Sequence, residues 1–306
     1  MPFTRIGRYE RRRQSPFREK CRRINPMTDI EPIIRRKFPQ ADRAAVQEKV
    51  CLAAEADPER FLAAYCLDSR SFQGRYVNSD LMKEMFPEYN ASKEHRNRYN
   101  LPVHNAAAVL AAAQFRAAVG DDSVPERTNA LFLTGVPGAG KTAAVLAYRD
   151  QFPQGARILY EGQLSDPVNS IPKFEAALGL GLDVEIVAIH VSSEQALANT
   201  ILRFEREGRG ATIEALARIQ GFLPSGLKQI STRFDNKIGF SVVDKRGTMG
   251  LIWLRGWEAL PLLESEGNYE HIKQKLTDFL KAQYASGLIT QASNEQALGQ
   301  ATPTFD

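Results

Sequence analysis

The stretch that decides the fold runs from residue 129 to residue 142 and reads NALFLT followed by GVPGAGKT. Its first part, Asn129 to Thr134, is a short apolar run of the kind that predicts a buried strand. Its second part, Gly135 to Thr142, matches the pattern G-x-x-x-x-G-K-S/T at every position. A helix-forming run then extends from Lys141 to about Asp150. A strand, a glycine loop and a helix in this order predict a phosphate-binding loop.

The composition of the loop has a chemical reason. Its glycines let backbone N–H groups turn inward around an anion, and the start of the following helix adds a positive end. Lys141 is expected to place its charge between the β- and γ-phosphates, and the hydroxyl of Thr142 is expected to bind Mg²⁺. The residues expected to hold ATP or GTP are Gly135, Val136, Pro137, Gly138, Ala139, Gly140, Lys141 and Thr142.

Outward from this stretch, strands and helices alternate. Further strands are predicted at 157–160, 183–191 and 238–243, with another candidate at 250–254, and GRYVNS at 74–79 is short and β-prone. Helices are predicted at 102–119 and after Ser192, where Gln195 completes a capping box and Gly208 ends the helix. This alternation predicts an α/β fold of the P-loop NTPase type, with a parallel sheet covered by helices on both faces and an N-terminal helical region.

Four regions are expected along the chain. They are a basic disordered arm at 1–27, a helical region at 28–70, a kinase domain at 71–260, and a C-terminal helix with a polar tail at 261–306, frayed from Ser293 onward. Residues 1–26 carry nine Lys or Arg against two Glu. Such an arm can attract nucleic acid or anionic lipid, although a solvated tail is the favoured interpretation.

The overall composition excludes several classes of protein. No apolar run approaches the roughly 18 residues that a membrane-spanning helix needs, and the basic N-terminus lacks the pattern of a secretory signal, so no membrane partner is expected. The three cysteines and four histidines are scattered without disulfide or metal-ligand spacing. A reducing cytoplasm is the expected compartment.

The residues around the loop favour a small-molecule kinase. A switch GTPase would need N-K-x-D, but Asn236-Lys237 lies in N-K-I-G, and the strand at 157–160 runs into Glu161 instead of the Asp-Glu of motor ATPases. A kinase needs a carboxylate to accept a hydroxyl proton. Asp80, Glu161 and Asp244 each follow a predicted strand, and the carboxyl ends of parallel strands share one edge. Each of them could also be a loop residue or a helix cap.

Cations for the transferred phosphate are expected on the helix that follows Ser192. Leu197, Ile201 and Phe204 form an apolar stripe, and Arg203 and Arg206 project from the other side. Arg209 follows in the turn after the helix. This segment could close over phosphates as a lid, or it could be a solvated face of paired charges.

At this point the chain resembles the zeta-toxin family of bacterial kinases. The segments that carry the resemblance are YEGQLS at 160–165, SEQAL at 193–197 with Arg203, GR at 208–209, and YVNSDLMK at 76–83 followed by PEY at 87–89. It implies Asp80 as general base, Lys141 and Thr142 at ATP and Mg²⁺, Glu161 near the substrate, and Arg203 and Arg209 on the phosphates. Gln163 stands at a substrate position where that family usually has Thr.

One departure from the family pattern leaves the base open. The Asp segment usually follows the glycine loop, whereas Asp80 precedes it by about sixty residues. The chain is either rearranged like a circular permutation, which we favour, or Asp166 is the base.

The resemblance implies as substrate a nucleotide sugar such as UDP-N-acetylglucosamine, or a dinucleotide such as NAD. It further implies a bacterial cytoplasmic toxin, or an effector delivered into a host or target cell, with an antitoxin or chaperone protein as partner. The alternatives are a polynucleotide kinase that grips nucleic acid with the basic arm, and a non-catalytic module that binds ATP and a protein partner.

Overall fold

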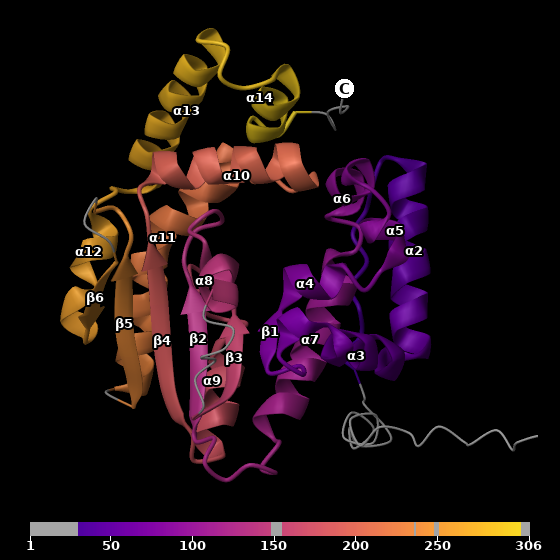
Figure 1. The fold of residues 1–306 in the computed structure, drawn as a ribbon, viewed down its shortest axis with the longest axis vertical. Helices are drawn as coiled ribbons and strands as arrows, with labels where there is room; N and C mark the ends of the chain where they lie inside the picture. Colours follow the sequence, from indigo (N-terminus) through magenta and orange to yellow (C-terminus); the bar gives the residue numbers. More distant parts are fainter. Residues whose placement is uncertain (1–29, 148–154, 236, 248–250, 301–306) are drawn as a thin grey trace, which may run out of the picture.

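The computed structural model describes residues 30–147, 155–235, 237–247 and 251–300, which form an α/β structure around one mostly parallel sheet (Figure 1). The strands are β1 (Tyr76–Asn78), β2 (Asn129–Thr134), β3 (Ala156–Glu161), β4 (Asp183–His190), β5 (Ile238–Asp244) and β6 (Ile252–Arg255). Their order across the sheet is β1-β3-β2-β4-β5-β6. The α/β class and the strands around the glycine loop are therefore confirmed.

The sheet is not fully parallel, contrary to expectation, because its edge strand β6 runs in the opposite direction. β6 pairs with β5 in the antiparallel direction, with Asp244 opposite Ile252. Only residues 245–251 separate the two strands. A parallel neighbour would need a crossover of a dozen or more residues, so this short connection allows only the antiparallel pairing.

The position of β1 brings the beginning of the chain to the glycine loop. Although β1 precedes β2 in sequence, it pairs in parallel with β3, and Asn78 lies opposite Glu161. On the other side of β3, Glu161 lies opposite Leu133 of β2. The carboxyl ends of β1, β3 and β2 therefore lie at one edge of the sheet, which we call the carboxyl edge.

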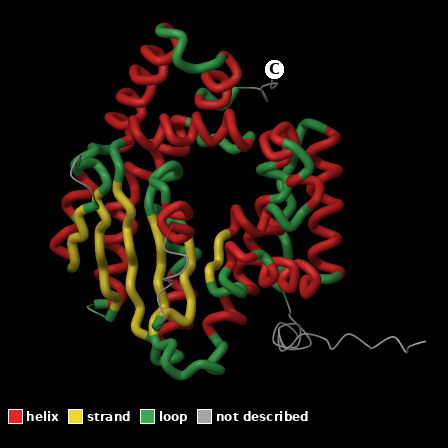
Figure 2. The backbone as a smooth tube through the Cα atoms, viewed as in Figure 1, coloured by secondary structure: helices red, strands yellow, loops and turns green. Residues whose placement is uncertain are grey.

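Helices pack on one face of the sheet to form the larger hydrophobic core. The sheet side chains are covered by α7 (His104–Val119), α9 (Ile171–Gly179) and α11 (Ile213–Phe234). Phe132 of β2 lies between Phe115 of α7 and Phe174 of α9, with ring centroids 6.0 and 4.3 Å away. The same core continues through α7 into α2 (Ala41–Ala56) and α3 (Pro58–Leu67), which lie beside the β1 end of the sheet (Figures 1 and 2).

A second core lies on the opposite face. It joins Leu133, Val187 and Val243 of the sheet to α8 (Lys141–Ala147), α10 (Ser193–Glu207) and α13 (Tyr269–Ala285). Helices therefore pack on both faces as expected, although all four side chains of β6 are exposed. Figure 1 shows α10 lying across the carboxyl edge, from the strands toward the N-terminal helices.

The remaining helices are short and mostly begin at capped positions. They are α4 (Ser79–Lys83), α5 (Pro87–Asn90), α6 (Lys93–Tyr99), α12 (Pro261–Glu264) and α14 (Gln291–Ala297). The frayed end expected from Ser293 is wrong in its first part, because Thr290 caps α14 and Ser293 is fully buried. The arm at 1–27, residues 148–150 of the helix after the loop, and residues 301–306 lie outside the described residues. Within the described ranges no helix is both long and apolar enough to cross a membrane.

Candidate functional site at the carboxyl edge of the sheet

The glycine loop (Gly135–Thr142) joins β2 to α8, and its backbone requires glycine. Gly135, Gly138 and Gly140 all have positive φ angles, of 136°, 83° and 79°. A Cβ atom on Gly138 would also lie only 2.4 Å from the carbonyl oxygen of Ala196 in α10. Side chains at these positions would strain the backbone or push α10 away, so the glycines set both the turn and its close approach to α10.

Lys141 folds back over the loop. Its ammonium donates to the carbonyl oxygens of Gly135 and Val136 at 2.9 and 3.1 Å, and Oε1 of Glu161 lies 3.7 Å away. Burial lowers the pKa of Lys141, while the charge of Glu161 opposes that shift. The side chain is a nearly buried cation inside a glycine loop, which is the arrangement that an oligophosphate needs.

Glu161, at the end of β3, is held by three side chains. Its Oε2 accepts hydrogen bonds from Asn78 Nδ2 at 2.8 Å and from Thr142 Oγ1 at 3.2 Å, and a third from the Tyr76 hydroxyl. The carboxylate therefore lies beside the hydroxyl expected to bind Mg²⁺. The sequence suggests a substrate contact for Glu161 and assigns no contact with Glu161 to Tyr76 or Asn78.

Asp80 lies in the first turn of α4, immediately after β1. Its side chain is 41% exposed, and its carboxylate forms ion pairs with Lys83 at 2.9 Å and with Arg209 at 3.0 Å. Burial would raise the pKa of Asp80, but Lys83 and Arg209 outweigh it and hold the pKa well below its usual range. Arg209 also pairs with Glu84 at 3.0 Å, so the turn after α10 is tied to α4 by two carboxylates.

The three arginines near the end of α10 differ in their surroundings. Arg206 is 77% exposed and pairs with the neighbouring Glu207, so the solvated-face interpretation holds for it. Arg203 donates from Nε to the carbonyl oxygen of Arg209 at 2.9 Å. Among the described residues, no carboxylate lies within 4 Å of the Arg203 guanidinium. Burial and the charge of Arg209 both lower the pKa of Arg203, which marks a position where an anion would be stabilised.

Helix α10 connects the glycine loop to the N-terminal helices. Near the middle of the helix, Asn199 Nδ2 donates to the carbonyl oxygen of Gly138 at 2.8 Å. At its C-terminal end, a Cβ on Gly208 would lie 2.1 Å from the carbonyl oxygen of Lys93 at the start of α6. From the position directly after β5, Lys245 Nζ donates to the carbonyl oxygen of Ala139 at 3.2 Å. Asn199 and Lys245 belong to no sequence motif, and neither was expected at the loop.

Three candidates from the sequence form no hydrogen bond or ion pair with this cluster among the described residues. Asp166 is exposed and accepts from the backbone N–H of Val168 at 3.2 Å, and Gln163 is exposed. Asp244 is buried and pairs with Arg246 at 3.1 Å, which in turn approaches Glu266. Asp80, Lys141, Thr142, Glu161, Arg203 and Arg209 are the predicted residues that lie together at the carboxyl edge.

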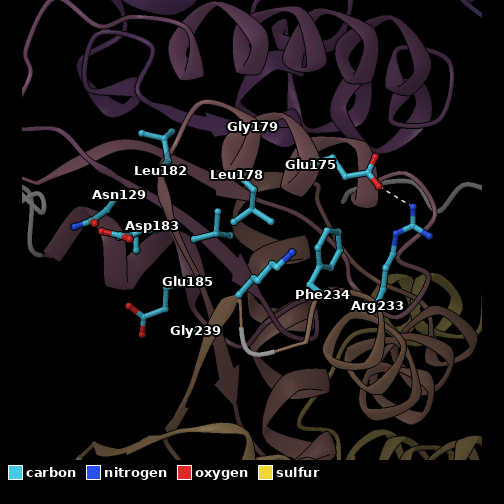
Figure 3. A pocket seen from close by; sticks show the side chains of 13 residues that line it. Asn129, Glu175, Leu178, Gly179, Leu182, Asp183, Glu185, Arg233, Phe234 and Gly239 are labelled. Carbon is cyan, nitrogen blue, oxygen red and sulfur yellow. Dashed lines mark hydrogen bonds and ion pairs between the residues drawn. The ribbon is translucent and has the colours of Figure 1, made fainter.

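A cavity of about 880 Å³ lies at the other end of the sheet (Figure 3). It is lined by the first residues of β2 and β4 and by side chains of α9 and α11, including the Glu175–Arg233 ion pair at 2.7 Å. None of the predicted site residues lines it. Within the described ranges, no group of three or more His, Cys, Asp or Glu side chains could hold a metal ion.

Comparisons with known proteins do not name this cluster. No protein-family model matches the chain, and no curated protein matches it. We therefore infer the function of the chain from the chemistry of the carboxyl edge.

Proposed function

We propose that this chain is an ATP-dependent kinase of the P-loop NTPase type that phosphorylates a sugar hydroxyl of a nucleotide-type small molecule. One observation carries the proposal. Asp80, in the helix α4 that directly follows β1 and precedes the glycine loop in sequence, forms an ion pair with Arg209 from the turn after α10. The charges of Asp80 and Arg203 also act on Lys141, whose pKa is lowered mainly by burial. A carboxylate, two arginines and the loop lysine thus meet at one edge, which is the set that phosphoryl transfer requires.

The nucleotide side of the site is the glycine loop. Its inward-turning backbone suits the β-phosphate, and Lys141 would exchange its carbonyl partners for the β- and γ-phosphate oxygens of ATP, or of GTP. Thr142 and Glu161 present two hard oxygens 3.2 Å apart, which fit Mg²⁺ bound through one or two protein oxygens and the phosphates. When bound, Mg²⁺ neutralises charge on the phosphates.

Asp80 is proposed to act on the acceptor hydroxyl. Because its pKa lies well below the usual range, Asp80 stays ionised and can accept a hydrogen bond from that hydroxyl. The acceptor oxygen then forms its bond to the γ-phosphorus while the bond to the β,γ-bridging oxygen breaks, and the proton passes to Asp80. A weak base is adequate here, because in a loose transition state the nucleophile keeps its proton until late.

The two arginines are proposed to stabilise charge on the transferred group. Arg209 is anchored by Asp80 and Glu84, whereas the Arg203 guanidinium has no carboxylate partner among the described residues. Arg203 is therefore the cation that is available to the γ-phosphate. Such an arginine typically contributes about 10³-fold or more to the rate.

The resemblance to zeta toxins supports the choice of acceptor and a biological setting. We propose UDP-N-acetylglucosamine or NAD as acceptor class, with Gln163 toward the acceptor. The same resemblance supports a toxin or effector role in or from a bacterial cytoplasm, with an antitoxin or chaperone as protein partner.

A γ-phosphate transfer assay tests the proposal. Wild type, Lys141→Ala, Asp80→Asn and Asp166→Asn are each incubated with ATP and UDP-N-acetylglucosamine, NAD or a 5′-hydroxyl oligonucleotide, and products are read by mass spectrometry. We expect one phosphate to be added to a nucleotide-type acceptor, with loss in Lys141→Ala and Asp80→Asn. Asp166→Asn is the matched control, because its carboxylate contacts only Val168 N–H among the described residues and should retain activity.

Each other outcome would favour a different function or a different base. Phosphate added only to the oligonucleotide would favour a polynucleotide kinase. Binding of ATP without transfer to any acceptor, unaffected by Asp80→Asn, would favour a non-catalytic module. Loss in Asp166→Asn but not in Asp80→Asn would show that the base had been assigned to the wrong carboxylate.

A further inference from the structure

Asn78, the last residue of β1, is buried between the start of α4, which carries Asp80, and the Glu161 carboxylate beside the glycine loop. Its Oδ1 accepts hydrogen bonds from the backbone N–H groups of Asp80 and Leu81, at 2.7 and 3.1 Å, and so caps α4. Two backbone donors facing one side-chain atom require that atom to be the oxygen. The orientation of the amide is therefore determined by the helix that carries Asp80.

The other end of the same amide faces the glycine loop. Asn78 Nδ2 donates to Glu161 Oε2 at 2.8 Å and to the Tyr76 hydroxyl at 2.9 Å, and it lies 3.5 Å from Thr142 Oγ1. The parallel register places Asn78 directly opposite Glu161. The backbone of Asn78 is held as well, because its N–H donates to the buried hydroxyl of Tyr65 at 3.0 Å.

We propose that Asn78 is a positioning residue that fixes the Glu161 carboxylate beside Thr142 and, through the same amide, the start of the helix that carries Asp80. The inference rests on the proposed function, because it assigns Asn78 a role at that site. Asparagine suits the position because one end of its amide must accept hydrogen bonds from the backbone of α4 and the other end must donate one to Glu161. Aspartate would cap α4 equally well but would set a second carboxylate against Glu161.

The capping equivalence of Asn and Asp gives a variant that separates the two roles. Asn78→Asp keeps the acceptor for Asp80 N–H and Leu81 N–H and removes the donor to Glu161. We expect it to weaken the Mg²⁺-dependent part of ATP binding by roughly tenfold or more, the usual effect of losing a partner that orients a metal-side ligand. ATP binding in the presence of a chelator should change little, because the glycine loop and Lys141 are untouched.

The experiment is a calorimetric titration of the full chain with ATP, with Mg²⁺ and with chelator, for wild type, Asn78→Asp and Tyr76→Phe. Tyr76→Phe removes one donor to the same Glu161 oxygen and leaves the cap of α4 intact, so a several-fold loss of the Mg²⁺ effect is expected. If Asn78→Asp does not fold, recovery of folding on adding Glu161→Gln, which restores the hydrogen bond with donor and acceptor exchanged, decides the matter. Wild-type Mg²⁺ dependence in the variants would overturn the inference while the proposed function stood.

A thermal unfolding comparison tests the contact without relying on catalysis. Asn78→Asp should lower the unfolding temperature, and adding Glu161→Gln should restore most of the loss, because the hydrogen bond re-forms with donor and acceptor exchanged. Absence of this rescue would overturn the inference. A wild-type chain that binds no ATP would refute the proposed function and this inference together, an outcome distinct from a difference confined to the variants.

Discussion

Replacing Arg209 or Arg203 by alanine should show which of these two arginines at the carboxyl edge stabilises the fold and which acts on the transferred phosphate. The Arg209 side chain is 14% exposed and lies between Asp80 and Glu84, the second of which is only 8% exposed. Removing one partner of a buried pair costs about 3–5 kcal/mol when the other charge is left alone. Here Arg70 still pairs with Glu84 at 2.9 Å, and Lys83 still pairs with Asp80. We therefore expect Arg209→Ala to lose about 2 kcal/mol of unfolding free energy.

Arg203→Ala should behave differently. Its removal forfeits one hydrogen bond to the carbonyl oxygen of Arg209, worth about 1 kcal/mol, and relieves the repulsion between two buried guanidinium groups. The net change in unfolding free energy should stay within about 1 kcal/mol of zero. If Arg203 stabilises the transferred phosphate, kcat should nevertheless fall by about 10³-fold.

Urea unfolding followed by circular dichroism, and initial rates of phosphate transfer, provide the two measurements. Arg206→Ala is the matched control, because this arginine lies on the same helix but is exposed, and it should change neither quantity appreciably. The reasoning is refuted if Arg203→Ala destabilises the chain more than Arg209→Ala does. It is also refuted if Arg203→Ala retains full kcat in a chain that transfers phosphate.

Three further outcomes are expected. Burial lowers the pKa of His104 from 6.5 to about 4, and the nearby charge of Lys83 adds to this shift. Between these pH values the unfolded chain binds more protons than the folded chain. The free energy of unfolding should therefore fall as the pH drops from 6.5 to 4. The slope should approach about 1.4 kcal/mol per pH unit, and His104→Gln should flatten it in urea titrations across that range. Gly208→Ala should cost roughly 2 kcal/mol or more, measured by urea unfolding, because the residue has a φ of 74° and its Cβ would meet the carbonyl oxygen of Lys93. Lys245→Met should weaken ATP binding about tenfold with little change in stability, because the Lys245 ammonium lies on the glycine loop. Calorimetry measures the affinity, and an unchanged affinity would show that Lys245 does not belong to the nucleotide site.

The elements with strong local signals were predictable from sequence. The strand at Asn129–Thr134 was placed correctly at both ends, and the helix capped by Ser192 ends at Gly208 in the left-handed conformation. The capping box was only half correct, because Gln195 donates its side-chain amide to Asn199 instead of returning to the cap. Apolar runs and caps depend on neighbours in sequence, so they can be interpreted without knowing the fold.

The polar contacts of the site could not be predicted in the same way. Asn199 and Lys245 contact the glycine loop although they lie 57 and 103 residues beyond Thr142, its last residue, and neither belongs to a motif. Asn78 did carry a local signal, since Asn-Ser-Asp after a short strand is typical of a helix start. Its second role, toward Glu161, depends on the pairing of β1 with β3, which periodicity does not specify.

That pairing also bears on the choice between Asp80 and Asp166. Distance along the chain does not determine distance at the edge of a parallel sheet, so the sequence left both carboxylates open. With β1 beside β3, Asp80 lies two residues after Asn78 and pairs with Arg209, whereas Asp166 accepts a hydrogen bond from the nearby backbone N–H of Val168. The helices before β1 then have a physical role, because the core that joins α2, α3 and α7 to the sheet holds this short edge strand in place. A three-residue strand has few backbone hydrogen bonds of its own, so Asp80 depends on that helical packing for its position at the loop.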